Sequence, residues 1–196
     1  MTSEKINVVT DGRVDMSISA NSMTCARWDD VAFSTEYYTA HQHFLVREDS
    51  TVDSLDDLAG REVCVTTRST SYDILGWLVP EAVPSPVPDR TGCLLALLEG
   101  EADAYFGHDS FLYGMEVQDP TVEARTDVVP PEYAEDTAAH YGIAIGHDHP
   151  DLVRFVNAVL EEVRANGTWA DLHDDLEVAI GVPGAVPPRA QYRTEG

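Results

Sequence analysis

The feature that most constrains the fold of this chain is an alternation of helix and strand patterns between residues 54 and 109. Residues 63–65 form an apolar, β-branched run that is typical of a buried strand. Apolar side chains then recur at helical spacing over 74–78, a second helical pattern stops near Gly100, and residues 102–106 read as another strand. Strands joined by helices at this spacing favour parallel pairing with helical crossovers, so the expected fold class is α/β.

The same region carries signals for the ends of its helices. Ser54 is placed to cap a short helix that ends at Gly60. Ser69, Thr70 or Ser71 is placed to cap the helix that follows the first strand. Hydroxyl side chains are therefore expected where a helix begins directly after a buried strand.

Breaker residues separate the remaining elements. Prolines predict a loop over 80–90 and irregular structure over 117–139. The stretch HYGIAI predicts a strand, Pro150 suits the first turn of an amphipathic helix, and Gly167 ends that helix before a shorter one. The C-terminal part is therefore expected to add one strand and two helices.

The charge of the chain excludes several classes of partner. Its 196 residues include 35 acidic and 12 basic ones, which gives a formal net charge of −23 with His neutral. Such a field repels phosphate backbones and anionic headgroups, so neither nucleic acid nor an anionic membrane surface is an expected partner. No apolar run reaches the roughly 18 residues that a membrane span needs. The N-terminal residues also lack the basic and apolar regions of a secretory signal.

Short histidine motifs do not amount to a predicted metal site. HQH at 41–43 and HDH at 147–149 each place two imidazoles on one strand face if the backbone is extended. A catalytic zinc site needs about three ligands, so both motifs are expected to be exposed polar residues. No C-x-x-C, Walker, G-x-S-x-G or G-x-G-x-x-G pattern occurs, and no metal or other cofactor is predicted.

Six stretches, taken in order, resemble the polar amino-acid-binding proteins of ABC importers (solute-binding protein family 3), which have the type 2 periplasmic-binding-protein fold. They are GRVDMSISANSMTCAR, AFSTEYY, LVREDSTVDSLDDLAGREVCVTTRSTS, GEADAYFGHD, YGIAI and RFVNAVLEEVRANGTWADLH. The resemblance runs from about residue 12 to about 180, and the proline-rich tail is similar to that of actinobacterial members.

The resemblance implies two α/β lobes that are joined by two extended crossings and close on a ligand between them. The first crossing is expected near 41–45 and the return near 137–141. Lobe two then spans 43–138, and lobe one combines 1–42 with 139–196. Lobe one is expected to be incomplete, because the chain begins where relatives have already formed two βα units.

The resemblance also implies which residues of lobe one bind the ligand. Arg27 ends a T-x-x-R step that starts at Thr24, the step whose arginine in relatives forks onto the ligand's α-carboxylate. Ser22 matches a further position that contacts the ligand. The alternative is a surface arginine paired with Asp29 or Asp30.

Lobe two contributes the opposite side of the implied site. Thr66, Ser69 and Thr70 match ligand-binding positions, the last two at a helix N-terminus that favours an anion. The acid that binds the ligand's ammonium group in relatives is replaced by His108, with Asp109 next to it. Because an imidazole is a poor substitute for a fixed negative charge, either Asp109 takes that role or the ligand lacks an ammonium group.

The resemblance further implies a disulfide and a compartment. Cys64 and Cys93 match a disulfide-bonded pair of actinobacterial relatives, which implies an oxidising, extracytoplasmic location. The alternative is two small buried hydrophobic residues, and the missing secretory pattern leaves a cytoplasmic location open. Cys25 is expected to have no role in the site.

Three functions are compatible with these residues. The first is a solute-binding module for transport or sensing, which binds an amino acid or another small carboxylate and works with an ABC permease. The second is a lyase or dehydratase on the same scaffold, with His108 as the acid–base group and Asp109 orienting it. The third is a regulatory relative that binds a partner, or itself, through the incomplete lobe. Binding is expected rather than catalysis, because no second catalytic group is apparent.

Overall fold

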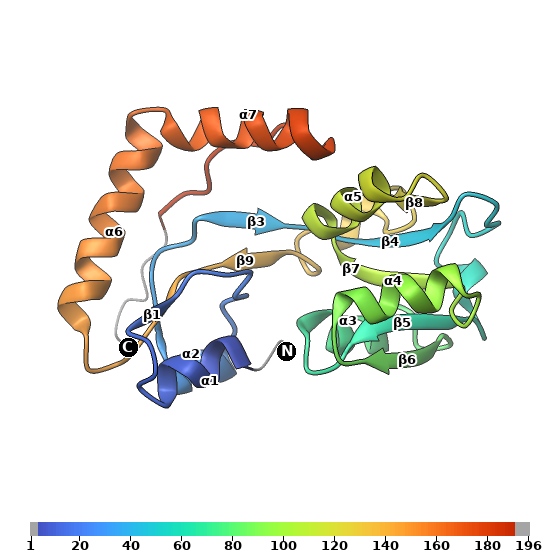
Figure 1. Cartoon of the computed structure of the whole chain (residues 1–196), viewed down its shortest axis with the longest axis horizontal. Helices are drawn as coiled ribbons and strands as arrows, with labels where there is room; N and C mark the ends of the chain where they lie inside the picture. The colour runs from blue at the N-terminus through green and yellow to red at the C-terminus, as the bar shows by residue number, and fades with distance from the viewer. Residues whose placement is uncertain (1–3, 191–196) are drawn as a thin grey trace. The chain divides into compact units, whose positions relative to one another are not determined.

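The computed structural model describes residues 4–190 as a mixed α/β fold whose contacts group into two units (Figure 1). Unit 1 is the continuous segment 40–139, whereas unit 2 combines the residues before and after it. The chain passes from one unit to the other within β3 (Tyr38–Ala40) and β9 (Ala139–Tyr141), and these strands pair as a two-stranded sheet.

Unit 1 is built on a five-stranded sheet with the strand order β6-β5-β7-β4-β8. Its elements are β4 (Gln42–Arg47), β5 (Glu62–Thr66), α3 (Thr70–Leu78), β6 (Val83–Val87), α4 (Arg90–Leu98), β7 (Ala104–His108), α5 (Asp109–Gln118) and β8 (Val122–Arg125), with 3-10 turns at Asp56–Leu58 and Pro131–Tyr133. Strand β5 pairs in parallel with both β6 and β7, which confirms the parallel pairing expected from the sequence. Strand β4 is antiparallel to β7 and β8.

Alternate side chains along these strands build a core on each face of the sheet. Val63 and Val65 point to the face that α3 covers, where the rings of Phe44 and Phe106 lie 4.6 Å apart. Cys64 points to the opposite face, which is covered by apolar side chains of α4 and α5. The inner strands β5, β7 and β4 are therefore buried on both faces, as is typical of a sheet with parallel strands.

Two strands of unit 1 lie where the sequence predicted loops. Strand β6 falls in the proline-rich stretch, and it is an edge strand, so Pro84 and Pro86 do not interrupt the inside of the sheet. Strand β8 and the end of α5 fall in the segment 117–139, which was expected to be irregular. That prediction was wrong for these residues, because tertiary pairing with β4 decides their conformation.

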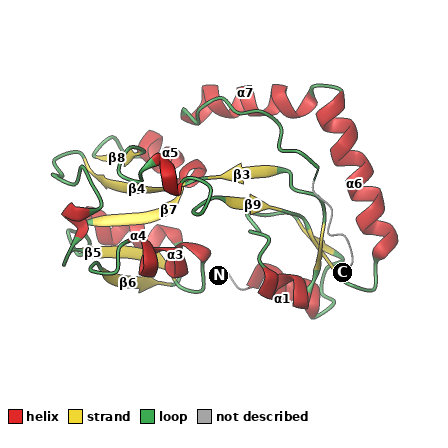
Figure 2. Ribbon diagram, turned by 180° about the vertical axis from the view of Figure 1, so that it is seen from behind, coloured by secondary structure: helices red, strands yellow, loops and turns green. Residues whose placement is uncertain are grey.

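Unit 2 is assembled from both ends of the described chain. Its elements are α1 (Glu4–Thr10), β1 (Met16–Ser17), α2 (Cys25–Asp30), β2 (Ala32–Phe33), β10 (Ala144–Ile145), α6 (Pro150–Ala165) and α7 (Thr168–Ile180). Strands β3 and β9 each belong partly to unit 2 and partly to unit 1. Strand β10 lies between β1 and β2 and is antiparallel to both. Pro150 begins α6 as predicted, and α6 and α7 meet at a corner at Gly167, whose φ of 86° is a left-handed conformation (Figures 1 and 2).

Candidate functional site

The residues expected to bind a ligand fall into two groups, one in each unit. Unit 2 holds Ser22, Thr24 and Arg27, and unit 1 holds Thr66, Ser69, Thr70, His108 and Asp109.

In unit 2, local structure holds Arg27 in place. Thr24 is the N-cap of α2, and its hydroxyl oxygen accepts a hydrogen bond from the backbone N–H of Arg27 at 3.3 Å. The T-x-x-R spacing is therefore that of an N-cap residue and the third residue of the helix. The side chain of Arg27 is half-buried, and its Nη1 donates to the carbonyl of buried Ser22 at 2.8 Å. Ser22 is itself fixed by a β-bridge to Tyr141.

Glu36 does not face water, since only 2% of its surface is exposed. Its Oε1 accepts from the hydroxyl of Thr39 at 2.5 Å and is hydrogen-bonded to Nδ1 of His140 at 3.0 Å. Its carbonyl accepts a hydrogen bond from Arg164 on α6. Burial raises the pKa of Glu36, but the hydrogen bonds from His140 and Thr39 and the charges of His140 and Arg164 outweigh it and leave the pKa below its ordinary value. Glu36 therefore connects the segment before β3 with β9 through its carboxylate and with α6 through its backbone carbonyl.

In unit 1, the carboxyl end of β5 leads directly into the N-terminus of α3. Ser69 is the N-cap of α3, as the sequence allowed, and its Oγ accepts from the backbone N–H of Tyr72 at 3.2 Å. The same hydroxyl donates to the carbonyl of Thr66 at 2.7 Å. Thr70 is the first residue of the helix, so its backbone N–H lies at the positive end of the helix dipole.

The loop between β5 and α3 contains a residue that the sequence did not single out. Arg68 has a φ of 57°, the left-handed conformation, although it is not a glycine. For an ordinary residue this conformation costs roughly 1–2 kcal/mol. Its side chain is exposed beside the N-terminus of α3. A pattern search does not find such a residue, because only the folded backbone reveals its conformation.

At the carboxyl end of β7, Asp109 is held by backbone donors. Only 6% of Asp109 is exposed, and its Oδ2 accepts from the N–H of His41 at 3.1 Å while Oδ1 accepts from the N–H of Ser110 at 2.6 Å. His108 is buried next to it, and its ring stacks on Phe111 with ring centroids 6.3 Å apart. The structure therefore gives unit 1 a fixed carboxylate at Asp109 beside a buried imidazole.

A buried amide lies at the same edge of the sheet. Gln42 is directly opposite His108 in the β4–β7 pairing, so the two side chains share a face of the sheet. Its Oε1 accepts from the hydroxyl of Ser71 at 2.9 Å, only 1% of Gln42 is exposed, and its Nε2 has no hydrogen-bond partner within residues 4–190. The sequence did not single out Gln42 because its place depends on the register of two distant strands.

Unit 1 also contains a disulfide bond. Cys64 of β5 is joined to Cys93 of α4, with a sequence separation of 29 residues and 5.5 Å between the Cα atoms. The bond ties a central strand to the helix that covers it. Cys25 is an exposed free thiol.

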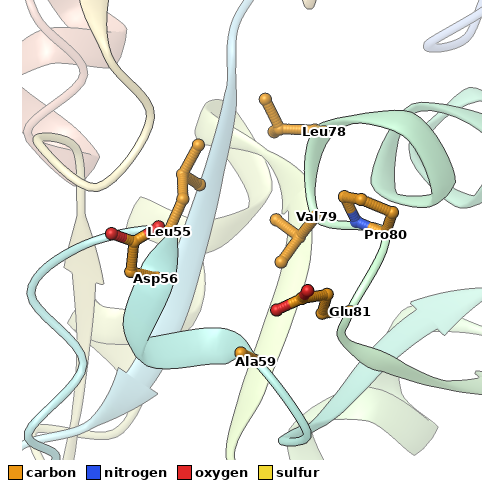
Figure 3. A pocket seen from close by; sticks show the side chains of 7 residues that line it. All are labelled: Leu55, Asp56, Ala59, Leu78, Val79, Pro80 and Glu81. Atoms are coloured by element: carbon orange, nitrogen blue, oxygen red, sulfur yellow. The ribbon is translucent and has the colours of Figure 1, made fainter.

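A pocket of about 370 Å³ lies at the far end of α3 from these residues (Figure 3). It lies between the 3-10 turn at Asp56–Leu58 and the end of α3, with the carboxylates of Asp56 and Glu81 and the apolar side chains of Leu55 and Val79 around it. Thr70 and Leu78 are roughly 12 Å apart along the helix axis. This pocket therefore does not include the candidate ligand residues.

Within residues 4–190, no helix is both long enough and apolar enough to cross a bilayer.

Comparison with known proteins connects the chain to a family of binding proteins. The family model for bacterial extracellular solute-binding proteins, family 3, matches residues 2–175. The glutamate-binding protein GluB of Corynebacterium efficiens is 28% identical over 93% of this chain and 65% of its own length. The glutamine-binding protein GlnH of a Bacillus subtilis ABC transporter is 25% identical over 86% of this chain and 60% of its own length. The chain thus spans somewhat less than two thirds of these relatives.

Solved structures share the fold. The P235GK mutant of ArgBP from T. maritima is 27% identical, with a TM-score of 0.73 over 90% of this chain and 72% of that protein. The substrate-binding protein AbpA from Streptococcus pneumoniae, bound to L-arginine, has a TM-score of 0.79 over 89% of this chain and 73% of that protein. At 24% identity, the second likeness shows the fold alone. Since the family model covers most of its length, the chain belongs to the bacterial extracellular solute-binding proteins, family 3.

Proposed function

We propose that this chain binds a polar amino acid, with Arg27 gripping the α-carboxylate and Asp109 receiving the ammonium group. The observation that carries the proposal is the placement of Arg27. Its position in the helix is fixed by the Thr24 cap and its guanidinium by the carbonyl of Ser22. A planar guanidinium makes two parallel, charge-assisted hydrogen bonds to a carboxylate, and a side chain already held in place loses less entropy when it binds.

Unit 1 supplies the complementary charge in this proposal. The carboxylate of Asp109 is buried and held by two backbone N–H groups, which supports a fixed negative charge for the ammonium group. Thr70 at the start of α3 adds a backbone donor for the ligand's carboxylate. In this proposal, unit 1 corresponds to lobe two of the relatives and unit 2 to lobe one.

The ligands of the relatives support the proposed class of ligand. The relatives include proteins that bind glutamate and glutamine. The proposed role is therefore that of an extracytoplasmic solute-binding protein that delivers an amino acid to an ABC permease, or that reports its presence. The disulfide between Cys64 and Cys93 supports an oxidising compartment.

The arrangement around His108 favours binding over a lyase or dehydratase reaction. A catalytic His108 requires a group that orients its ring, and Asp109 was the candidate. The two carboxylate oxygens of Asp109 accept from the backbone N–H groups of His41 and Ser110, which supports an orientation of this carboxylate set by the backbone rather than by the ring of His108. The enzyme therefore remains the second hypothesis.

Calorimetric titration with L-glutamate, L-glutamine and L-arginine tests the proposal. Arg27→Gln is expected to weaken the affinity for the ligand at least about 100-fold, because it removes two charge-assisted hydrogen bonds that are each worth roughly 1.5–3 kcal/mol, and every 1.4 kcal/mol is a factor of ten. The matched control is Arg154→Gln, which removes an exposed arginine that is ion-paired with Asp151 on α6. The proposal is contradicted if wild type binds none of these amino acids, or if wild type and Arg27→Gln bind them with equal affinity.

A second substitution separates the two ends of the ligand. Asp109→Asn is expected to weaken binding of amino acids while leaving unchanged the weak binding of glutarate, which has carboxylates but no ammonium group. If both ligands lose the same affinity, Asp109 supports the fold of the site and does not bind the ammonium group.

A further inference from the structure

A cluster on α7, outside the candidate ligand residues, combines an imidazole with two carboxylates. His173, Asp174 and Glu177 each offer one ligating atom, and these atoms all lie within 4.8 Å of one another. His173 and Glu177 are four residues apart, so both lie on the same face of the helix, with Asp174 at its side. Ligands of a tetrahedral zinc ion are about 3.4 Å apart, so the exposed carboxylates need to move only about 1 Å to bind one ion.

The imidazole of this cluster is fixed and buried. Only 5% of His173 is exposed, and its ring stacks on Trp169 with centroids 5.0 Å apart and on Tyr38 with centroids 6.2 Å apart. Its Nδ1 is buried and has no hydrogen-bond partner in the described part of the chain. Leaving such a nitrogen unsatisfied costs free energy, and a bound cation is one way to satisfy it.

Without a bound cation, the two carboxylates of the cluster destabilise the helix. Helix α7 ends at Ile180, and no basic residue lies in its last turn. The C-terminal end of a helix carries a partial negative charge, which disfavours the acidic side chain of Glu177 in that turn. Asp174 and Glu177 are three residues apart, so they also repel each other. A cation bound between them removes both penalties, and the net charge of −23 raises the local cation concentration.

The chain that follows α7 passes close to this cluster. Gly181 ends the helix with a φ of 74°, and its N–H donates to the carbonyl of Glu177 at 2.8 Å. A β-carbon added to Gly184 lies 3.3 Å from Oε2 of Glu177, so the following segment passes close to this carboxylate. Glycine at position 184 keeps that approach open.

We infer that His173, Asp174 and Glu177 form a binding site for one Zn²⁺ ion, with water as the remaining ligand. One nitrogen and two carboxylate oxygens suit zinc, whereas Mg²⁺ prefers an all-oxygen set with several waters. Trp169 donates from Nε1 to the carbonyl of Tyr37 at 2.7 Å, and Tyr38 stacks on His173. Zinc binding therefore stabilises α7 against the segment that leads into β3.

The test is a titration of the tag-free chain with zinc chloride, in the absence of amino acid, so that its outcome is independent of ligand binding. The background carries Cys25→Ser, because Cys25 is an exposed free thiol and a thiolate is itself a metal ligand. We expect one equivalent of zinc to bind and to raise the melting temperature by several degrees, with no such rise from magnesium chloride. Binding of no zinc overturns the inference.

Substitutions of the two carboxylates are expected to weaken zinc binding but to stabilise the metal-free chain. Asp174→Asn and Glu177→Gln are expected to weaken zinc affinity about tenfold or more and to raise the melting temperature of the metal-free chain, because they remove charge repulsion. His173→Phe keeps a ring for stacking but removes the nitrogen ligand, so zinc affinity is expected to fall as well.

The matched control is Asp175→Asn, which removes a neighbouring exposed acid that is not part of the cluster. This variant is expected to retain the zinc affinity of the parent chain. If Glu177→Gln, His173→Phe and Asp175→Asn all bind zinc with the parent affinity, the ion binds elsewhere and the inference is wrong.

Discussion

Two hydroxyl residues of the candidate site form hydrogen bonds with the backbone of their own helices. Thr24 and Ser69 are both N-caps, and the side-chain oxygen of each accepts a hydrogen bond from a backbone N–H of its helix. The position of Arg27 follows from this, because an N-cap fixes the residue three places later. Roles of this kind can be predicted from the sequence, since they depend on residues that are close along the chain.

Other features of the candidate site depend on residues that are far apart in the sequence. The carboxylate of Asp109 is held by the N–H of His41, 68 residues away, and Gln42 lies opposite His108 only because of strand register. The contacts of Glu36 with His140 and Arg164 likewise span more than a hundred residues. Spacing along the chain carries no information on such contacts.

His43 predicts a dependence of stability on pH. Burial, and then the nearby charge of His41, lower the pKa of His43 to about 4, against the opposing effect of Asp127. The unfolded chain binds a proton at this side chain near pH 6.5, so between pH 6.5 and 4 it holds more protons than the folded chain. The free energy of unfolding therefore falls as the pH drops through this window, by about 3 kcal/mol at most.

Denaturant unfolding of His43→Gln and wild type at several pH values measures this effect. Between pH 6.5 and 4, the free energy of unfolding of wild type is expected to fall more steeply than that of His43→Gln. The control variant His147→Gln, which changes an exposed histidine, is expected to behave as wild type. An NMR titration of the His43 ring with a midpoint near 6.5 contradicts the prediction.

At the scale of elements, the alternation of helix and strand patterns located most of unit 1. Strand β5 and helices α3 and α4 lie where the spacing of apolar residues predicted them, and Gly100 follows α4 in a left-handed conformation. The signals are strong because these elements are amphipathic or fully buried. The short helix expected after Ser54 is a 3-10 turn, and the hydroxyl of Ser54 donates to the carboxylate of Asp57 instead of capping it.

The elements that the sequence did not predict are those with weak intrinsic preferences. Strand β6 contains two prolines and is stabilised only by its pairing with β5. Strand β8 depends on β4 in the same way, and α1 has only two buried side chains, Ile6 and Val9. In each case tertiary contacts outweigh local propensity.

The disulfide predicts the stability of the element pair that it joins. Replacing Cys93 by Ala is expected to lower the free energy of unfolding by about 3–4 kcal/mol, because the cross-link restricts a loop of 29 residues in the unfolded chain. Denaturant unfolding monitored by circular dichroism measures the difference. Cys25→Ser is the control, since this thiol is exposed and unpaired with another cysteine.

Addition of a reductant distinguishes the bond from the packing of the cysteine side chain. Wild type is expected to lose stability when it is reduced, whereas Cys93→Ala is expected to be unaffected. Equal stability of oxidised and reduced wild type contradicts the stabilising role.

At the scale of the whole molecule, the family resemblance alone predicts a division of the chain into two parts. The resemblance implied one lobe over 43–138, and the contacts of the structure group 40–139 into one unit. That these units act as the closing lobes of a binding protein stays a prediction. Composition and hydrophobic periodicity do not predict such a division, since the segments on either side of it carry the same kinds of helix and strand patterns.

Unit 1 is predicted to fold without the rest of the chain. All five strands of its sheet, both of its cores and its disulfide come from the continuous segment 40–139. An excised segment 40–139 is expected to show cooperative thermal unfolding and dispersed amide NMR signals. A collapsed species without cooperative unfolding contradicts this prediction.

Unit 2 has a different dependence on chain order, with a consequence for synthesis on the ribosome. Strand β10 lies between β1 and β2, so the N-terminal segment cannot complete its sheet until residues 144–145 have been made. At roughly 5–20 residues per second, that interval is on the order of 5–20 s. During translation, the segment that forms β1 and β2 therefore lacks its central sheet partner and is accessible to chaperones while unit 1 is synthesised and folds.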